Sequence, residues 1–363
     1  MRILRNYVLK EHLGPFLVTV GGLTAVLLIG NIVKFAELII TKGVSFLDIL
    51  RLLIYLIPYL LDFTIPMACL VAMVMAFTRL NTDFELIAMR ASGVSPARLI
   101  APAMTVAMLF SAFLLVLNDR VVPESHLAFR RQLKAIGIKH PTAYLEAGTF
   151  IKAFTPYVLF MYQLEGKTML DVRIYEPRDD GPTRTIVANR GDLEPLPDEK
   201  GIQITLHDGQ VDEWDPKHPG ALYKVAFGTY TMTLTAPDED VTRLAKKLKE
   251  MTFSELWRER RLLDAQGIDT RPISLEWHRR VASSFATVVF VLFGLSVGLG
   301  STHHERLIIF IWILALFIGY YLAAVGTTAI AMKGWLPPWL AMWIPNFLGG
   351  AFGAFRTWRA VRS

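Results

Sequence analysis

The sequence predicts a polytopic α-helical membrane protein with an inserted all-β domain. Several stretches contain no Asp, Glu, Lys or Arg, and a long polar segment divides the apolar stretches into two groups of three. That polar segment is rich in β-branched and aromatic residues. Only 19% of the 363 residues are charged, against about 25% in ordinary soluble proteins. A soluble globular enzyme is therefore excluded.

Six stretches are long enough to cross a membrane, since a helix needs about 20 mostly apolar residues to span a hydrocarbon layer about 30 Å thick. One of them, residues 52–78, contains a single acid, Asp62. The first stretch is too long for the apolar part of a cleavable signal peptide. We therefore expect six transmembrane helices. The uncharged stretches are residues 13–33, 99–118, 281–300, 307–332 and 335–355.

Residues 121–280 form a polar segment of domain length between the third and fourth spans. Short predicted strands separated by clusters of turn residues favour a sandwich, barrel or jelly roll over a βαβ fold. The strands are predicted at 149–162, 172–175, 201–206 and 223–235, and the turn clusters at 176–182, 194–201 and 215–220.

A helix is predicted after the strands, over residues 252–266, beginning near Thr252 or Ser254 and ending at Gly267. We therefore divide the chain into transmembrane helices one to three (1–120), a β domain with a connecting helix (121–270) and transmembrane helices four to six (271–363).

The basic residues of the short loops predict the orientation in the membrane. If the N-terminus is cytoplasmic, ten Lys or Arg residues lie on the cytoplasmic side and four on the other. This bias predicts two cytoplasmic termini and places the β domain outside. The ten are Arg2, Arg5, Lys10, Arg79, Arg90, Arg98, Arg306, Arg356, Arg359 and Arg362; the four are Lys34, Lys42, Arg51 and Lys333.

A short helix is predicted between the second and third spans, near residues 82–92. Thr82 and Glu85 fit a capping box, in which the hydroxyl and the carboxylate each bond a free backbone N–H. Gly93 supplies a left-handed end, and Ser95-Pro96 opens the next helix with proline in its first turn. We expect about three helical turns between these signals.

This helix combines apolar and charged side chains, which leaves two interpretations open. It either rests on the lipid headgroups as an amphipathic helix, or it is a docking helix for a cytoplasmic partner. The apolar residues are Leu86, Ile87 and Met89, and the charged ones are Asp83, Glu85 and Arg90.

No motif for nucleotide binding, metal binding or catalysis is found. The only approach to a Walker A loop is Gly166-Lys167-Thr168, where the required first glycine is replaced by Met161, so we predict a hairpin turn. His303-His304-Glu305 lacks a third ligand at a usable spacing and is predicted to be a solvated loop. The single cysteine, Cys69, excludes an internal disulfide.

Two charges near or within the membrane are candidates for function. Asp62 lies between Pro58 and Pro66, and an ionisable group at this depth is a functional candidate by default. Alternatively, its carboxylate faces a water-filled interior, or the group is protonated and bonds to backbone freed by the prolines. Lys34 ends the first span; it either snorkels to the interface or meets an anionic headgroup or phosphate from inside a cavity.

These features together resemble the lipopolysaccharide export permease family (LptF/LptG, also called YjgP/YjgQ). The strongest match is residues 82–93, Thr-Asp-Phe-Glu-Leu-Ile-Ala-Met-Arg-Ala-Ser-Gly. The resemblance covers essentially the whole chain. Arg279-Arg280 and the Gly-Leu-Gly at 298–300 resemble the F-type subunit, and Lys34 resembles the G-type at least as much; together they favour the F-type. Further matches lie at residues 42–44, 58–66, 276–282 and 293–300.

The resemblance implies the permease subunit of an ABC exporter in the bacterial inner membrane, with six transmembrane helices and a periplasmic β-jellyroll. In this family, a pair of LptF/LptG-type subunits sits on an LptB ATPase dimer, which binds the ATP, and is joined by the single-span LptC. The pair holds lipopolysaccharide in a cavity formed largely by spans one and five, then passes it to a periplasmic LptA-type bridge. The chain itself is then neither an enzyme nor a holder of a cofactor.

The resemblance also assigns roles to residues. The coupling-helix glutamate that engages the ATPase aligns with Glu85, and we expect Leu86, Met89 and Arg90 beside it. The basic residue that contacts the anionic core of the lipid aligns with Lys34. Lys42 and Arg51 have no motif match, but they are also candidates to meet phosphate.

Two other functions stay open from the sequence alone. One is an ion-coupled membrane transporter that uses Asp62. The other is a membrane-anchored scaffold whose β domain binds periplasmic proteins.

Overall fold

The computed structural model describes residues 2–139, 147–151, 154, 156–178, 181–196, 201–214, 222–235, 245–300 and 306–362. The chain splits into two compact units. The helical unit comprises Met1–Asn31, Ile54–Ala128 and Lys246–Ser363; the β unit comprises Ile32–Leu53 and Phe129–Ala245. Each unit is described by itself. The domain limits at residues 120 and 270 remain a prediction.

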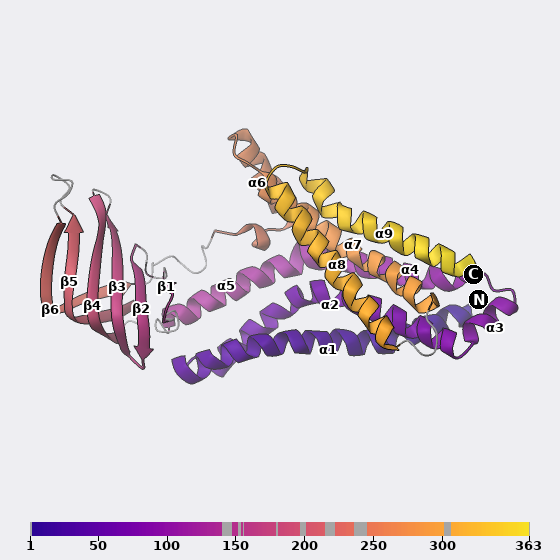
Figure 1. Cartoon of the computed structure of the whole chain (residues 1–363), viewed down its shortest axis with the longest axis horizontal. Coiled ribbons are helices and arrows are strands. Elements are labelled where there is room, and N and C mark those ends of the chain that lie inside the picture. The colour runs from indigo at the N-terminus through magenta and orange to yellow at the C-terminus, as the bar shows by residue number, and fades with distance from the viewer. Residues whose placement is uncertain are drawn as a thin grey trace. The chain divides into compact units, whose positions relative to one another are not determined.

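Long helices make up most of the described chain outside the sheet (Figure 1). Helix α4 continues through a π-helical turn, η1, directly into α5. The helices are α1 (Arg2–Lys42), α2 (Phe46–Thr82), α3 (Glu85–Ala91), α4 (Pro96–Val116), η1 (Leu117–Val121), α5 (Val122–Lys139), η4 (Leu248–Glu250), α6 (Phe253–Ala265), α7 (Arg271–Gly300), α8 (Arg306–Met332) and α9 (Pro338–Arg362).

Within the part of the chain that the structure describes, five helices are long and apolar enough to cross a membrane. They correspond to the first five expected spans, which confirms a helical membrane protein. The expected sixth span forms α9, a helix of 25 residues. Its Pro345, Asn346 and glycines make it less apolar than the others. The five are Asn6–Ile40, Phe46–Thr82, Arg98–Ile136, Arg271–Leu299 and Ile308–Met332.

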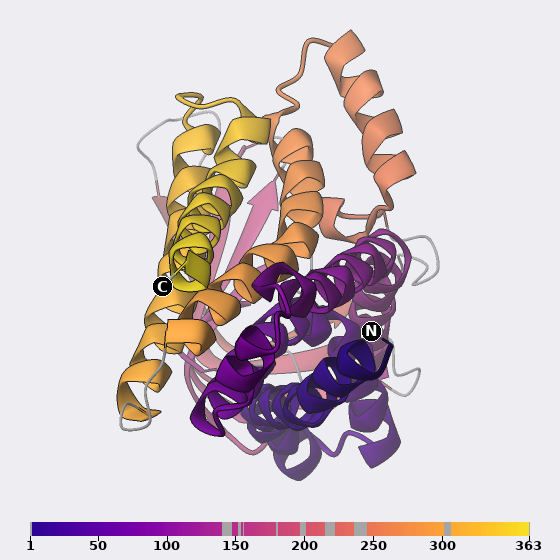
Figure 2. The same ribbon diagram turned by 90° about the vertical axis from the view of Figure 1, so that its right-hand side faces the viewer.

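The spans differ greatly in how much of their surface is buried within the chain. In the most apolar part of each helix, 72% of α2 and 67% of α7 is buried, against 0% of α1 and 6% of α8. In Figure 2, α7 (orange) lies between α4 (purple) and α9 (yellow), both of which it contacts. Helix α7 is therefore central to the helical unit, whereas α1 and α8 leave long apolar faces uncovered.

Glycines on α7 and α9 allow helix backbones to approach closely. A Cβ added at Gly294 would lie 2.7 Å from the Cβ of Met73 on α2, and one at Gly349 would lie 2.7 Å from Cγ1 of Val289. In lipid, the hydrophobic effect does not drive helices together. Small residues at helix crossings instead allow close van der Waals packing, which stabilises the contact.

The β unit contains one antiparallel sheet of six described strands in the order β1-β2-β3-β4-β5-β6. The inserted all-β domain is thereby confirmed, and its strand order, which the sequence left open, is a consecutive meander without the crossovers of a jelly roll. The strands are β1 (Phe150–Ile151), β2 (Val158–Glu165), β3 (Thr168–Arg178), β4 (Gly181–Pro195), β5 (Gly201–Trp214) and β6 (Leu222–Thr235).

One face of this sheet forms a continuous apolar core. Leu159 on β2, Ile204 on β5 and Leu234 on β6 are fully buried in a cluster that includes residues of every strand. Since one flat layer would leave this face in solvent, the sheet must curl so that its own strands cover the core. Gly166, with φ of 63°, makes the predicted hairpin turn between β2 and β3.

Strand β4 was not expected from the sequence. The strand predicted at 149–162 is divided into the shorter strands β1 and β2, whereas β3, β5 and β6 are longer than predicted. Charged residues along β4, including Arg184 and Arg190, and the internal Gly191 hide its alternation. A Cβ at Gly191 would lie 3.0 Å from side-chain atoms of both Leu206 and Met169, so glycine makes room for residues of the neighbouring strands. Parts of all three predicted turn clusters (179–180, 197–200 and 215–220) lie outside the described residues.

The α6 prediction is confirmed. Thr252 is the N-cap and forms a capping box with Glu255, and Gly267 follows with φ of 71°. Partial burial opposes ionisation of Glu255, but bonds from Lys246 and from the Thr252 backbone N–H hold its pKa below the usual value.

We expect Gly294→Ala to destabilise the protein by about 1–3 kcal/mol, because the added methyl group overpacks the contact between α7 and α2. Thermal unfolding of the purified chain in detergent measures this. Gly319→Ala on α8 is the matched control, since nothing lies within 4 Å of a Cβ at Gly319. Equal effects of the two variants would contradict the close α2–α7 contact.

Candidate functional site

The predicted coupling segment, residues 82–96, begins differently from the prediction. Thr82 is the last residue of α2, and the N-cap of α3 is Phe84, in a left-handed conformation (φ 57°) and without a side-chain cap bond. The predicted capping box is therefore wrong. Helix α2 keeps its backbone bonds beyond the apolar stretch, with the Asp83 N–H donating to the Arg79 carbonyl at 2.9 Å. Only a tight turn remains, and Phe84 completes it.

The end of the coupling segment matches the prediction. Helix α3 has seven residues, about two turns rather than three. Gly93 has φ of 82°, and its N–H donates to the Arg90 carbonyl at 2.9 Å. Ser95 is the N-cap of α4, with Pro96 in the first turn. Glycine permits the left-handed stop, and proline fixes the start of the next helix.

Polar contacts attach α3 to α1 and α2. The Tyr7 hydroxyl on α1 donates to Oε2 of Glu85 at 2.7 Å. Arg79, near the end of α2, pairs with Glu11 of α1 and with Asp83, at 3.5 Å for the latter. The first residue of α3 is thus bonded to α1, and the turn before it is held by the same two helices.

The residues of α3 divide into an inner and an outer set. Leu86 is buried in an apolar cluster with Val8, Leu80 and Leu99, and Met89 packs partly against it. Ile87 and Phe84 are exposed. Of the residues expected at the ATPase contact, Glu85, Met89 and Arg90 are half-buried and Leu86 points inward. The exposed position of Phe84 at the start of α3 was not predicted, because nothing in the local sequence indicates its left-handed backbone.

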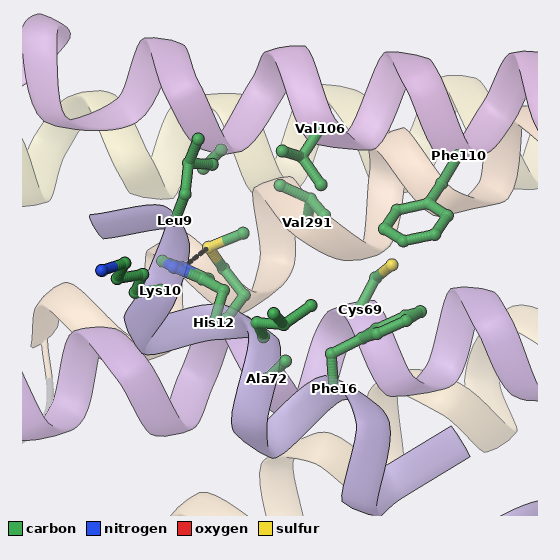
Figure 3. Close-up of a pocket in the computed structure, with 12 residues that line it drawn as sticks. Leu9, Lys10, His12, Phe16, Cys69, Ala72, Val106, Phe110 and Val291 are labelled. Atoms are coloured by element: carbon green, nitrogen blue, oxygen red, sulfur yellow. Dashed lines mark hydrogen bonds between the residues drawn. The ribbon is translucent and has the colours of Figure 1, made fainter. Parts of the chain in front are cut away.

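An apolar cavity of about 300 Å³ lies between α1 and the rest of the helical unit (Figure 3). Its walls come from α1, α2, α4 and α7. His12 reaches across it to Met73, with Nε2 3.0 Å from the sulfur. Packing of this part of α1 against the helical unit is therefore incomplete, and the lining side chains lose some van der Waals contacts. The labelled walls in Figure 3 include Leu9, Phe16, Cys69, Ala72, Val106, Phe110 and Val291.

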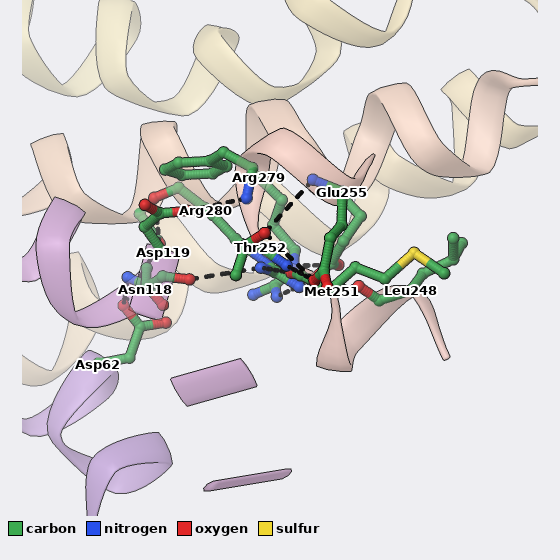
Figure 4. Close-up of polar contacts among 12 residues, drawn as sticks. Asp62, Asn118, Asp119, Leu248, Met251, Thr252, Glu255, Arg279 and Arg280 are labelled. Atoms are coloured by element: carbon green, nitrogen blue, oxygen red, sulfur yellow. Dashed lines mark hydrogen bonds and ion pairs between the residues drawn. The ribbon is translucent and has the colours of Figure 1, made fainter. Parts of the chain in front are cut away.

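Asp62 is buried, and its partners are side chains rather than the backbone freed by the prolines. Asn118 Nδ2, on η1, donates to Oδ1 of Asp62 at 2.6 Å, and the Ser283 hydroxyl on α7 lies 3.4 Å from the same oxygen. Asn118 also donates to the Ser284 hydroxyl at 3.3 Å. Asp62 thereby joins α2, η1 and α7 (Figure 4).

Arg280 on α7 is the centre of a second group of buried polar contacts, also seen in Figure 4. Its side chain is 1% exposed and bonds Oε1 of Glu276 at 2.8 Å. It also donates to the carbonyls of Met251 at 2.6 Å and Leu248 at 2.9 Å. A longer bond of 3.3 Å reaches the Asn118 carbonyl. One arginine therefore fastens η1 and the segment before α6 to α7.

A further bond joins these two segments directly. The Phe253 backbone N–H, at the start of α6, donates to Oδ1 of Asp119 at 2.8 Å. The structural role of Arg280 is not predicted from the sequence. The signal that was available is the spacing of Glu276 with Arg279 and Arg280, three and four residues apart at the start of a span, which suits helical ion pairs.

The three basic residues expected at the substrate lie in the β unit, near the end of α1 and the start of α2. Lys34 is exposed, and Lys42 is the last residue of α1. Arg51 is exposed and lies 3.4 Å from Asp48, which also accepts a bond from Gln132 of α5 at 2.8 Å.

None of the described residues form a group of three or more His, Cys, Asp or Glu side chains that could hold a metal ion. His303, His304 and Glu305 lie outside the described residues.

Comparison with known families supplies the identification. The model of the lipopolysaccharide export system permease family LptF/LptG matches residues 6–359. The chain belongs to this family. It is 22% identical over 362 residues to LptF of Escherichia coli K12, covering 95% of this chain and 92% of that protein, and equally similar to LptF of Shigella flexneri. An uncharacterized protein of Rickettsia prowazekii is 24% identical over 260 residues, covering 70% of this chain and 71% of that protein.

Membership confirms the family indicated by residues 82–93, and the similarity to LptF agrees with the preference for the F-type. The chain is a membrane permease of a lipopolysaccharide export family. The roles of Glu85, Leu86, Met89 and Arg90, and those of Lys34, Lys42 and Arg51, remain predictions.

We expect Arg280→Met to lower the free energy of unfolding of this permease by about 3–5 kcal/mol, because it leaves several buried acceptors without a donor. Arg279→Met is the control: Arg279 also bonds Glu276 but is 38% exposed, and its loss should cost about 1 kcal/mol or less. Thermal unfolding in detergent compares them. Equal destabilisation would show that Arg280 holds nothing more than the shared ion pair.

Proposed function

We propose that this chain is the transmembrane permease subunit of an ABC exporter. It extracts lipopolysaccharide from the outer leaflet of the bacterial inner membrane and passes it to a periplasmic LptA-type bridge. The observation that carries the proposal is the attachment of α3 to α1 through the bond between Tyr7 and Glu85. A movement imposed on α3 from outside is transmitted to α1, a span that buries little of its apolar surface within the chain.

The energy comes from a separate LptB-type ATPase dimer, which binds the ATP; this chain holds no cofactor and catalyses no reaction. The ATPase contacts α3 through Glu85, Met89 and Arg90. The exposed side chains of Phe84 and Ile87 add apolar area to that surface. Leu86 supports the contact from beneath, since it is packed in the core of the helical unit.

The substrate cavity forms where α1 and α8 meet the same spans of a paralogous LptF/LptG-type subunit. Their uncovered apolar faces suit the acyl chains of the lipid. Lys34, Lys42 and Arg51 supply positive charge for the phosphates of its headgroup. An LptC-type single-span protein completes the assembly.

The β unit receives the lipid and connects to the periplasmic bridge. Strand β6 pairs only with β5 among the described strands, so its outer edge can extend into a partner's sheet. The loop charges support a periplasmic location for this unit and a cytoplasmic location for both termini.

We expect Glu85→Ala to reduce co-purification of the LptB-type ATPase by roughly tenfold, because the substitution removes a charged contact at the docking helix. The measurement is the ratio of ATPase to tagged chain after purification in mild detergent. Tyr7→Phe is the control, since it removes the internal bond to Glu85 and leaves the carboxylate. If the recovery of the ATPase is unchanged with Glu85→Ala, Glu85 does not contribute to the ATPase contact.

A photo-crosslinking amino acid in place of Val26 on α1 or Leu322 on α8 should form lipopolysaccharide adducts in the assembled exporter. Leu109 on α4 is the matched control, because the three side chains are similarly exposed at 65%, 66% and 65%. Adducts are expected at the first two positions and to depend on ATP. Equal adducts at Leu109 would mean that the label reports general contact with lipid and would contradict the cavity.

A further inference from the structure

A second cavity, of about 260 Å³, lies between α6 and the first turns of α7. Its walls differ from those of the cavity beside α1, because they combine aromatic, cationic and hydroxyl side chains. Helix α6 contributes Trp257 and Arg260, and α7 contributes Ser274, Trp277 and His278. Residues spaced three and four apart share one face of a helix, so two facing stripes line this cavity.

The cavity lies at the level where a membrane meets water. The uncharged stretch of α7 begins at Val281, so Trp277 and His278 lie within one turn of the hydrocarbon boundary. Tryptophan is enriched at this depth because its ring is apolar and its N–H is polar.

Helix α6 has the composition of a helix that lies in the headgroup layer. Trp257 and Leu262 are exposed apolar residues, and Arg258 and Arg261 add positive charge to the same helix. The guanidinium of Arg261 lies over the Trp257 ring, 3.3 Å from its centroid. The three arginines of α6 are balanced by Glu255, Glu259 and Asp264, so it is the exposed aromatic and aliphatic side chains beside a charged face that suit a helix at the lipid–water interface.

The lining groups have bonding capacity to offer a ligand. Arg260 lies 3.6 Å from Asp264 in an exposed ion pair, and such pairs exchange readily because they contribute little. Nδ1 of His278 is buried and has no hydrogen-bond partner among the described residues. Ser274 adds a hydroxyl, and none of the residues that line the cavity is acidic. A planar guanidinium beside hydroxyl and imidazole groups suits a phosphate oxygen.

We propose that this cavity binds the phosphate of an anionic lipid headgroup. Arg260 and His278 contact the phosphate, Ser274 donates to it, and the indoles of Trp257 and Trp277 enclose the glycerol end of the lipid. Free phosphate shares the same chemistry, but the interfacial depth and the aromatic walls favour a ligand with an attached acylglycerol. The site lies within this chain and stands apart from the proposed ATPase contact and export cavity.

The test uses the full chain in detergent, stripped of lipid and titrated with dihexanoyl phosphatidylglycerol, with bound lipid counted by native mass spectrometry. We expect Arg260→Ala and His278→Ala each to weaken binding about tenfold, the effect of losing a hydrogen bond to a charged group. Arg258→Ala is the matched control, because Arg258 is an exposed arginine of α6 that does not line the cavity. Arg260→Lys, which keeps the charge, should retain part of the affinity.

Two competitors separate the sources of the ligand. Dihexanoylglycerol, which lacks phosphate, should not displace the lipid, and millimolar inorganic phosphate should displace it only weakly. Equal weakening by Arg258→Ala and Arg260→Ala would overturn the site in favour of general attraction of the lipid to the arginines of α6. Displacement by inorganic phosphate as effective as that by the lipid would overturn the assignment to a headgroup. If the folded wild-type chain does not bind the lipid, the cavity between α6 and α7 is a gap in packing and not a binding site.

Discussion

The buried guanidinium of Arg280 constrains the helical unit more than any other single group. A cation removed from water is tolerated only if it is paired and its N–H groups are satisfied. Four acceptors meet this need, one from Glu276 and three from the carbonyls of Asn118, Leu248 and Met251. The π-helical turn η1 provides the Asn118 carbonyl, and the short helix η4 with its C-cap Met251 provides the other two, since irregular helix geometry and helix ends leave such groups available. The two segments are thereby fixed to α7 at one point.

Around this point the helical unit separates into a tightly packed part and a loosely held part. Helices α2, α7 and α9 interlock at glycines such as Gly294 and Gly349. Helices α1 and α8 bury little of their most apolar surface. Yet the N-terminal end of α1 is bonded to the short helix α3 through Tyr7 and Glu85. In a permease of this family, such a division lets one helix change position while the packed part keeps its arrangement.

Much of this arrangement could be predicted from the sequence, because strong local signals decide it. Uncharged stretches specify spans, Gly93 and Pro96 set the limits of helices, and Thr252 with Glu255 forms a capping box as expected. Features that depend on distant residues could not be predicted. Strand β4 is hidden because arginines interrupt its apolar alternation and because Gly191, which leaves room for Leu206 and Met169, adds no side chain to the pattern. The inward position of Leu86 is likewise set by contacts with other helices, and so is the role of Arg280.

The cavity beside α1 has a pharmacological consequence. Dry apolar cavities bind small hydrophobic molecules, since no polar group in them retains water strongly. This one separates a weakly held helix from well-packed ones and is almost entirely apolar, with His12 and Lys10 among its lining residues. A compact hydrophobic compound with one acceptor for His12 or one anionic group for Lys10 would act as a wedge. It would stop α1 from settling against α2 and α4.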